Sequence, residues 1–416
     1  MAGKQILVVG SGGREFAIAK ALLASPQVAR VYCAPGNVGM TAIGVEPVAI
    51  AELDFAALVA FAKEHQVDWT FVGPEDALVA GIVDYFHAAG LQIFGPTARA
   101  AQLEGDKDYA LTFMQRYGVP TAQHASYDGV ADALAGIDQF GFPVVVKANG
   151  LAGGKGVVIA QDQAAAESAV RDLFKPGERL VLEECLVGPE YSLFVLIENG
   201  RYRILPMAQD HKRALDGDRG PNTGGMGAYS PLPQLAAADY QRMVDEVVEP
   251  TVKGLVAGEY HYHGILYIGL MLTATGPKVI EYNVRLGDPE TQVILPRLAT
   301  DLFELVDACL ADADLPAVTE KEEAVLGVVL AAKGYPQAPV KGQPLKPLPA
   351  APGIAVDYAN VAGDLDHLTG AGGRLLMVIA TAKKLADAQR MVYDYLEELN
   401  EPNCQYRHDI GDRAVK

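Results

Sequence analysis

The sequence predicts an α/β protein that begins with an open parallel β-sheet. The first observation is that buried strand patterns alternate with helix patterns through the first hundred residues. The second is that two of these strands end in Gly-Pro turns, at residues 73–75 and 95–97. Ligands bind at the carboxyl ends of parallel strands, so Glu75 is expected at the ligand-binding edge of the sheet. The third is that strand patterns resume after residue 320, which indicates a small mixed α/β unit at the C-terminus.

Length and composition limit the class of protein. A chain of 416 residues is too long for one hydrophobic core and predicts two to four domains. With 50% hydrophobic and 21% charged residues, the chain is an ordered globular protein. The 34 basic and 52 acidic residues give a formal net charge of −18, which argues against a nucleic-acid partner or an anionic membrane surface. A site for a phosphorylated ligand must therefore be a local group of Lys and Arg.

The cysteines and the hydropathy indicate where the protein works. The four cysteines are far apart and form no Cys-x-x-Cys pair, so neither zinc nor disulfides are expected. The apolar run at residues 6–9 is too short for a signal peptide, and no apolar stretch reaches transmembrane length. We therefore expect a cytoplasmic protein with no membrane partner.

The elements of the first unit, residues 1–105, follow from the patterns. Strands are predicted at residues 6–9, 31–33, 70–72 and 92–94, and helices at residues 15–24, 55–65 and 78–88. The glycine-rich loop at residues 10–15 is not a dinucleotide site, because position 15 is Glu and the second strand is followed by no acid for a ribose. An NAD-dependent oxidoreductase is therefore disfavoured. The loop can still bind an anion through backbone N–H groups at a helix start.

The middle of the chain, residues 106–320, contains two glycine-rich segments. A helix at 106–117 is followed by strands at 144–147, 157–159 and 180–183. Residues 149–156, between the first two strands, depart from the Walker pattern at both ends. They resemble a hairpin that closes over phosphates with Lys155 near its tip, although a flexible hairpin with one solvated lysine is equally compatible. Residues 209–213 and 220–227 combine a basic pair with many glycines and form a second plausible anion cradle.

Residues 281–296, EYNVRLGDPETQVILP, are the most informative stretch of the chain. Glu281 and Asn283 would point to one face of a strand, and their oxygens suit Mg²⁺ that keeps waters and substrate phosphates as its other ligands. Arg285 would lie on the same face and could hold an anion with its fork of donors. A strand end with a solvated acidic turn would have the same residues, so these positions alone leave both interpretations open. His261 and His263 have no third partner nearby and are more simply ordinary residues than metal ligands.

Residues 321–416 predict a further unit. Strands are expected at 325–331 and 375–380. The last helix carries apolar residues at helical spacing, namely Leu385, Ala388, Val392, Leu396 and Leu399.

Taken together, these motifs resemble ATP-grasp enzymes and specifically the phosphoribosylamine–glycine ligase family. The resemblance extends over essentially the whole chain. The segments that carry it are residues 94–97, 102–105 before Lys107, 209–213, 220–231 and 285–296. The last segment agrees with the family signature at every defining position. The resemblance implies a Rossmann-like unit at 1–105 and a two-lobed, α+β ATP-grasp unit at 106–320 in which residues 121–187 form a small mobile lid.

The resemblance also implies the roles of individual residues. It predicts two lysines that neutralise the ATP phosphates and a glycine-rich lid over them. It also predicts a hinge that contacts adenine and an acid that binds the ribose. These residues are Lys107, Lys147, Gly153, Gly154, Lys155, Glu183, Glu184, Leu186 and Glu190. Glu281 and Asn283 would hold Mg²⁺ or Mn²⁺. Arg285, with Lys147, Asp210 and Lys212, would be catalytic.

The implied substrates are ATP, glycine and 5-phosphoribosylamine. Glycine would be activated as glycyl phosphate and then attacked by the amine of phosphoribosylamine. The residues expected around these substrates are Gly12, Gly13, Arg14, Glu15, Glu75, Arg213 and Gly287. A monomer is expected. Three departures from the family pattern concern the substrate edge, namely Phe16 in place of His, Asp106 in place of Ser, and Asp76-Ala77 in place of Ala-Pro.

Two rival interpretations differ in what they require of the sequence. Another ATP-grasp enzyme, such as a carboxylase or a formate-dependent transformylase, would share Lys147 and Glu281. It would not be expected to carry residues 221–231 and 285–296 together. A nucleotide-binding regulatory protein without turnover would have no need of the metal ligands or Arg285.

Overall fold

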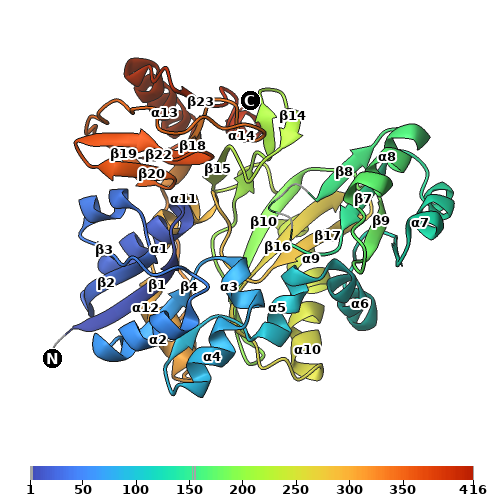
Figure 1. The fold of residues 1–416 in the computed structure, drawn as a ribbon, viewed down its shortest axis with the longest axis horizontal. Coiled ribbons are helices and arrows are strands. Elements are labelled where there is room, and N and C mark those ends of the chain that lie inside the picture. The colour runs from blue at the N-terminus through green and yellow to red at the C-terminus, as the bar shows by residue number, and fades with distance from the viewer. Residues whose placement is uncertain (1–2, 152, 154–155, 416) are drawn as a thin grey trace.

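The N-terminal unit is the open parallel sheet that the sequence predicts. In the computed structural model, which describes residues 3–151, 153 and 156–415, this sheet has the strand order β3-β2-β1-β4-β5 with every pairing parallel. Its strands are β1 (Lys4–Gly10), β2 (Val28–Pro35), β3 (Glu46–Pro47), β4 (Trp69–Val72) and β5 (Ile93–Phe94). The segments between these strands include α1 (Gly13–Leu23), the 3₁₀ helix η1 (Val38–Ile43) and α2 (Phe55–Glu64). The blue elements of Figure 1 show this unit.

The predicted helix at residues 78–88 is wrong, because the structure has two helices there. They are α3 (Glu75–Val79) and α4 (Ile82–Ala88). Gly81 precedes α4 with φ +90°, a left-handed conformation that ends one helix and redirects the chain before the next. Glu75 is consequently the first residue of a short helix that starts at the carboxyl end of β4.

A helix that the sequence patterns did not reveal lies next to it. Helix α5 (Ala98–Gly105) precedes α6 (Lys107–Tyr117), and Asp106 separates them. The Asp106 carboxylate accepts a hydrogen bond of 2.9 Å from the Tyr109 backbone N–H, as the N-cap of α6. The cap explains why two helices follow each other with a single residue between them.

Residues 121–187 contain an antiparallel sheet of order β6-β9-β7-β8. Its elements are β6 (His124–Tyr127), α7 (Val130–Gly136), η2 (Ile137–Gln139), β7 (Val144–Ala148), β8 (Val157–Ala160), α8 (Gln163–Leu173) and β9 (Leu180–Glu184). The predicted hairpin of two strands around residues 149–156 is confirmed as the β7–β8 pair. The buried residues between the helices and the sheet form an apolar cluster distinct from the two larger cores of the protein.

A second antiparallel sheet, of order β11-β10-β16-β17, lies beside this first one (Figure 1). Its strands are β10 (Glu190–Glu198), β11 (Arg201–Ile204), β16 (His263–Thr273) and β17 (Gly276–Asn283), backed by α9 (Ala237–Met243), the π-helix η3 (Val244–Val248) and α10 (Glu249–Ala257). In the β16–β17 register Gly269 is opposite Glu281 and Leu270 is opposite Val279, so Ile280 is an extra residue. This bulge lies directly before the two predicted metal ligands, and bulges commonly re-aim the side chains that follow.

The C-terminal sheet combines strands from two parts of the chain. Its order is β12-β15-β18-β22-β19, with β23 paired to β18. Its strands are β12 (Gln209–Asp210), β15 (Gly227–Ser230), β18 (Ala324–Ala332), β19 (Ile354–Tyr358), β22 (Arg374–Ala382) and β23 (Cys404–Gln405). The unit boundaries at residues 105 and 320 stay predictions, and this sheet contains strands from both sides of the second boundary.

Short elements complete the chain. They are β13 (Arg213–Leu215), β14 (Arg219–Asn222), α11 (Thr291–Ile294), η4 (Leu295–Arg297), α12 (Leu302–Leu310), β20 (Val361–Asp364), β21 (His367–Gly370) and α14 (Asp412–Val415). Helix α13 (Leu385–Leu399) lies on the C-terminal sheet, and its five predicted apolar residues are all buried. All four cysteines are free. Among the described residues, no helix has the length and apolar character that a bilayer crossing requires.

Gly188 lies where the segment before β10 passes close to the backbone of β16. A Cβ at Gly188, which has φ +156°, would lie 2.1 Å from the backbone oxygen of Leu272. Gly44 has φ +82° but nothing within 4 Å of a Cβ. We expect Gly188→Ala to cost about 1–3 kcal/mol more than Gly44→Ala, because backbone cannot move aside as a side chain can. Thermal unfolding followed by circular dichroism checks this, and equal Tm values for the two variants would contradict it.

Candidate active site

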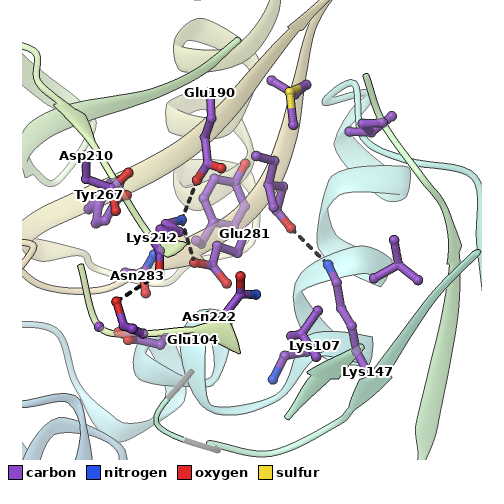
Figure 2. Close-up of a pocket in the computed structure, with 18 of the residues that line it drawn as sticks. Glu104, Lys107, Lys147, Glu190, Asp210, Lys212, Asn222, Tyr267, Glu281 and Asn283 are labelled. Carbon is purple, nitrogen blue, oxygen red and sulfur yellow. Dashed lines mark hydrogen bonds and ion pairs between the residues drawn. The ribbon is translucent and has the colours of Figure 1, made fainter. Parts of the chain in front are cut away.

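One cleft brings together residues from distant parts of the sequence. Its volume is about 810 Å³, and residues of the two antiparallel sheets line it, together with others from the N-terminal and C-terminal units (Figure 2). The predicted site residues that line it are Arg14, Glu75, Lys107, Lys147, Gly153, Glu183, Glu184, Leu186, Glu190, Asp210, Lys212, Arg213, Glu281, Asn283 and Arg285. Residues as far apart in the sequence as Arg14 and Arg285, which are separated by 271 positions, therefore share one cavity.

The remaining predicted residues lie elsewhere. Gly12 and Gly13 line a neighbouring cavity of about 40 Å³, which shares Asp288 and Arg374 with the large cleft. Glu15 is buried, and its carboxylate accepts the Gly12 backbone N–H at 2.7 Å, so it shapes the loop rather than the cleft wall. Gly287 does not line the cleft, and its carbonyl oxygen accepts the Thr291 N–H. Gly154 and Lys155 lie outside the described residues.

Two lysines face the cleft from the side of the small antiparallel sheet. Lys147, on β7, places Nζ 2.6 Å from Glu183 Oε2 on β9, and both side chains are buried. Lys107 Nζ donates to the Gly150 carbonyl oxygen at 2.9 Å. Burial, and then the nearby Lys147, lower the pKa of Lys107, whereas Glu281 opposes the shift. Each lysine thus has a protein partner that an incoming polyphosphate can replace.

A third lysine lies against the opposite wall. Lys212 forms an ion pair with Glu190, and its Nζ is 3.9 Å from Glu281 Oε1. Burial favours the neutral amine, but Glu190 and the surrounding acids outweigh it and raise the pKa of Lys212 well above its usual value. Burial likewise opposes ionisation of Glu281, but Lys212 and Lys147 outweigh it and lower the pKa of that carboxyl. Both groups are therefore charged at neutral pH.

Glu281 and Asn283 fit a divalent cation that brings part of its own shell. The Glu281 side chain is ionised and 40% exposed, and it opens into the cleft. Asn283 Oδ1 accepts from Arg285 Nη2 at 3.0 Å, and its buried Nδ2 has no hydrogen-bond partner. Within the part of the chain that the structure describes, no three His, Cys, Asp or Glu side chains are grouped to hold a metal. Two oxygen ligands suit an ion that also takes phosphate and water oxygens, as Mg²⁺ does.

Arg285 is the most heavily partnered cation in the cleft. Its Nε is 3.1 Å from Glu75 Oε2, and its Nη2 is 2.8 Å from Glu104 Oε1. Arg285 lowers the pKa of Glu75 to about 2. Burial raises the pKa of Glu104 to about 7, although Arg285 opposes the shift. The two carboxylates fix the guanidinium in one orientation beside Asn283.

Glu104 is a residue of the site that no sequence motif assigned to a role. Its carboxylate also accepts the Val284 backbone N–H at 2.8 Å, which joins α5 to the end of β17. Glu104 and its neighbour Leu103 are both buried, and a buried acid on a helix usually has a partner that neutralises it. This was the signal that could have pointed to Glu104. Because α5 itself was not predicted, that signal was missed.

The C-terminal unit also contributes residues that sequence reasoning missed. Arg374, at the start of β22, donates from Nη1 to the carbonyl oxygens of Gly224 at 2.7 Å and Asp288 at 2.6 Å. Its Nη2 is 3.1 Å from the Asp288 carboxylate. Arg413, on α14, lines the same cleft. Neither arginine belongs to a local motif, so no spacing pointed to them.

Comparison with known proteins identifies the family. Models of the phosphoribosylglycinamide synthetase N domain, ATP-grasp (A) domain and C domain match residues 4–104, 105–291 and 325–413. The phosphoribosylamine–glycine ligase of Lactococcus lactis is 47% identical over 414 residues, which cover 99% of this chain and 100% of that protein. The chain belongs to the phosphoribosylamine–glycine ligase family.

Solved structures agree with this assignment. The crystal structure of phosphoribosylamine–glycine ligase from Thermotoga maritima is 33% identical, covers 98% of this chain and 100% of its own, and superimposes with a TM-score of 0.85. The biotin carboxylase domain of the 2-oxoglutarate carboxylase from Hydrogenobacter thermophilus is 17% identical over 97% of this chain and 91% of its own, with a TM-score of 0.74. The second likeness concerns the fold alone. The predicted ATP-grasp architecture is confirmed.

The departures from the usual phosphoribosylamine–glycine ligase pattern have structural explanations. Phe16 is buried and packs edge-on against Tyr358 of β19, with ring centroids 5.8 Å apart. Asp106 caps α6, a role that Ser fills equally well. Asp76 lies in the first turn of α3, where an acid is favourable, and Ala77 beside it is buried. None of these residues lines the cleft.

The Arg285 network predicts how acid affects stability. An ordinary glutamate titrates near 4.5, whereas the pKa of Glu75 is about 2 in the folded protein, and this difference corresponds to about 3 kcal/mol. The folded state binds fewer protons, so this contribution is complete above pH 4.5 and is lost as the pH falls toward about 2. Glu75→Gln should lower stability at neutral pH and flatten its decline in acid. Urea unfolding across this range measures both effects, with the exposed Glu64→Gln as control; parallel pH curves for wild type and Glu75→Gln would contradict the expectation.

Proposed function

We propose that this protein joins glycine to 5-phosphoribosylamine at the expense of ATP, giving glycinamide ribonucleotide, ADP and phosphate. The relative from Lactococcus lactis, which is named for this activity, matches over its full length. The observation that carries the proposal is that Glu281, Asn283 and Arg285 share one cleft with Lys107 and Lys147. Phosphoryl transfer requires ligands for a metal ion, a cation that holds the transferred phosphoryl group and lysines that neutralise the phosphates.

ATP fits the cleft in one direction. The end near β7, β8 and the segment after β9 is lined by apolar side chains, namely Leu111, Met114, Val145, Val157, Ile159, Leu186 and Met271. The Glu184 carboxylate is occupied by Lys278 Nζ at 2.6 Å and by the Gln123 N–H at 2.9 Å. The hinge would therefore contact adenine through its backbone. Glu190, close to the hinge, would accept the ribose hydroxyls once they replace Lys212.

The reacting end is organised by charge. Lys107 and Lys147 would neutralise the phosphates, and Arg285 would hold the γ-phosphoryl group while charge spreads over its oxygens. Glu281 and Asn283 would hold a divalent cation, which would supply positive charge to offset the charge of the phosphate oxygens. Lys212 stays cationic beside Glu281 and adds to the positive field. We propose Asp210 as a catalytic residue because it is buried and lines the same cleft as Lys212.

The chemistry proceeds in two balanced steps. A glycine carboxylate oxygen attacks the γ-phosphorus, the bond to ADP breaks, and glycyl phosphate forms. The amine of phosphoribosylamine then attacks the acyl carbon, phosphate leaves, and the amine loses one proton. Both the acyl phosphate and the ribosylamine react with water, so closure of residues 121–187 over the cleft would protect them.

The substrates would enter where the N-terminal unit meets the cleft. Arg14 and Glu75 line that end, and Gly12 and Gly13 line the small cavity that adjoins it. Arg14 Nη1 donates to the Leu286 carbonyl oxygen at 3.2 Å, which links the N-terminal loop to the turn at Gly287. We place the phosphoribosyl group toward this loop, with Arg213 on the other side.

The finer assignments follow the same reasoning. We propose Mg²⁺, with Mn²⁺ as a substitute, because both accept a carboxylate, an amide oxygen and phosphates. We propose a monomer that acts in the cytoplasm, where four free thiols are stable.

The activity has a direct test. ADP should form only when Mg²⁺, glycine and phosphoribosylamine are all present, and a metal chelator should stop it. Glu281→Ala should lower kcat by about 100-fold or more, since the site loses one of the two proposed ligands of the divalent cation. A coupled assay for ADP measures both effects, with Glu322→Ala, an exposed acid outside the cleft, as the control.

The substrate dependence separates the rival activities. ADP release supported by bicarbonate or formate in place of glycine would exclude the ligase and favour another ATP-grasp reaction. Tight ATP binding without any ADP formation under all of these conditions would favour the regulatory protein.

A further inference from the structure

The segment that carries Asp210 and Lys212 continues into a two-stranded ribbon that is not part of a larger sheet among the described residues. Strands β13 and β14 follow at once, and the tip between them is residues 216–218. Among the described residues these two strands pair only with each other. A two-stranded ribbon is marginally stable in water, so its position must be set by contacts outside the sheet.

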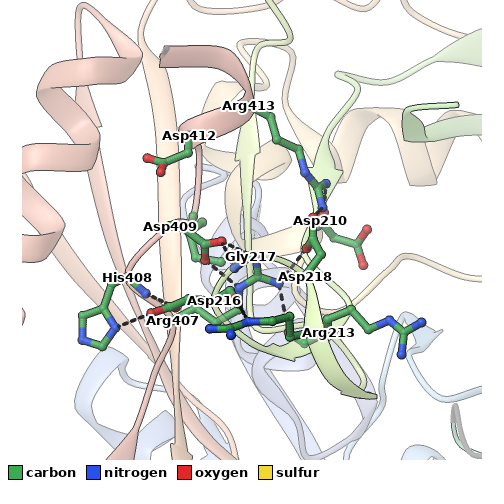
Figure 3. A network of polar contacts seen from close by, with 12 residues as sticks. Asp210, Arg213, Asp216, Gly217, Asp218, Arg407, His408, Asp409, Asp412 and Arg413 are labelled. Carbon is green, nitrogen blue, oxygen red and sulfur yellow. Dashed lines mark hydrogen bonds and ion pairs between the residues drawn. The ribbon is translucent and has the colours of Figure 1, made fainter.

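The last residues of the chain hold the tip of this ribbon (Figure 3). The His408 backbone N–H donates to Asp216 at 2.8 Å, and the Gly217 N–H donates to Asp409 Oδ2 at 2.8 Å. Arg407 Nη1 donates to Asp218 Oδ1 at 2.9 Å. All three consecutive residues of the tip are therefore bonded to the C-terminal segment.

The same segment also holds the base of the ribbon. Arg407 Nη1 donates to the Arg213 carbonyl oxygen at 3.0 Å, and Arg413 Nη1 donates to the Asp210 carbonyl oxygen at 3.1 Å. Arg413 Nη2 is 2.7 Å from Asp218 Oδ2. Each arginine thus joins the Asp218 carboxylate at the tip to a main-chain oxygen of residues 210–213, and Lys212 lies between these two bonded residues in the sequence.

These contacts are made within a packed and charged environment. Arg407 is 1% exposed, and a guanidinium that deeply buried is stable only with its partners in place. Burial opposes ionisation of Asp409, but the bonds from Arg407 outweigh it and lower the pKa of Asp409 to about 2. Ile410, which follows Asp409, is fully buried, and a Cβ at Gly227 of β15 would lie 2.9 Å from its side chain. The segment 407–413 is therefore firmly attached to the sheet that contains β12 and β15.

We propose that Arg407 and Arg413 are positioning residues that fix residues 210–213 for the ligase reaction, so that the end of the chain completes the active site. The proposal rests on the proposed function. Lys212 lies in sequence between the two residues whose carbonyl oxygens are bonded, and its amine pairs with Glu190 of β10 and lies 3.9 Å from Glu281 of β17. A displacement of the ribbon base therefore moves Lys212 relative to the predicted metal ligand.

The structure also predicts which kinetic quantities change. None of the bonds of Arg407 or Arg413 reaches the hinge at residues 183–186, which lies at the other end of the cleft. Loss of the bonds from Arg407 and Arg413 to residues 210–218 should therefore slow turnover at the reacting end of the cleft and leave the affinity for ATP unchanged. A role in stability alone would lower Tm without this separation.

The experiment uses the full-length protein with five variants, one of which is Arg413→Lys. Arg413→Met removes both bonds, Asp218→Asn weakens the tip end, and the third variant combines them. Arg390→Met is the matched control, because Arg390 is an exposed arginine of the same unit, with its side chain 66% exposed, that pairs with Asp387 at 2.9 Å. Steady-state ADP formation gives kcat and the KM for each substrate, and calorimetric titration with a non-hydrolysable ATP analogue gives its Kd.

Arg413→Met should lower kcat/KM for phosphoribosylamine by about 10- to 100-fold, the size of effect that a misplaced catalytic group produces, with Kd for the analogue changed less than about twofold. The double variant should be little worse than Arg413→Met, because both changes break one clamp. Arg390→Met should match wild type. Arg413→Lys keeps the charge but cannot span the Asp210 oxygen and Asp218 together, so it should recover only part of the loss.

Distinct outcomes would overturn the two proposals. Wild-type protein that forms no glycine-dependent ADP overturns the function, and the positioning role with it. If the wild-type protein turns over and Arg413→Met has the same kcat and KM values, the positioning role alone is overturned. Equal losses of ATP binding and turnover would show a general structural role and also overturn it. If Arg413→Met does not fold, Asp218→Asn and Arg413→Lys decide by the same kinetic criteria.

Discussion

The burial of the Arg285 guanidinium is the constraint on which the site depends. A buried cation needs acids around it, and here Glu75 comes from α3 and Glu104 from α5, whereas Asn283 ends β17. The helices α3 and α5 of the N-terminal unit must therefore meet the end of β17, because only there can Glu75 and Glu104 pair with Arg285. Glu104 strengthens the junction by accepting the Val284 N–H. The proposed metal ligands and the proposed phosphoryl clamp are placed together as a consequence.

Charge in the cleft is arranged in pairs rather than as a basic patch. The chain carries a formal net charge of −18, and Lys147 and Lys212 each have an acidic partner, Glu183 and Glu190 respectively. Pairing removes the cost of burying a lone cation, and it leaves the lysines available to phosphates that offer more negative charge. A strongly acidic protein can in this way present a site for a polyanionic nucleotide.

The C-terminal unit forms part of the cleft wall, through Arg374 and Arg413. Its sheet takes in β12 and β15 from the middle of the chain, and Arg374 holds the glycine-rich loop and the Asp288 turn from the same side. The segment 407–413 adds its bonds to the ribbon of β13 and β14. Two units of the protein thus meet around residues 209–230, which by themselves form only short strands.

The sequence alone determined what depends on neighbouring residues. Period-two and helical patterns gave the parallel sheet, the β7–β8 hairpin and α13, and the two-residue spacing of Glu281 and Asn283 gave a shared face. Tertiary structure decided the rest, because Glu104 and Val284 are 180 positions apart and Arg374 and Gly224 are 150 apart. Spacing along a chain carries no information about such pairs. Only the packing of separate units, driven by the need to satisfy buried charges, brings them together.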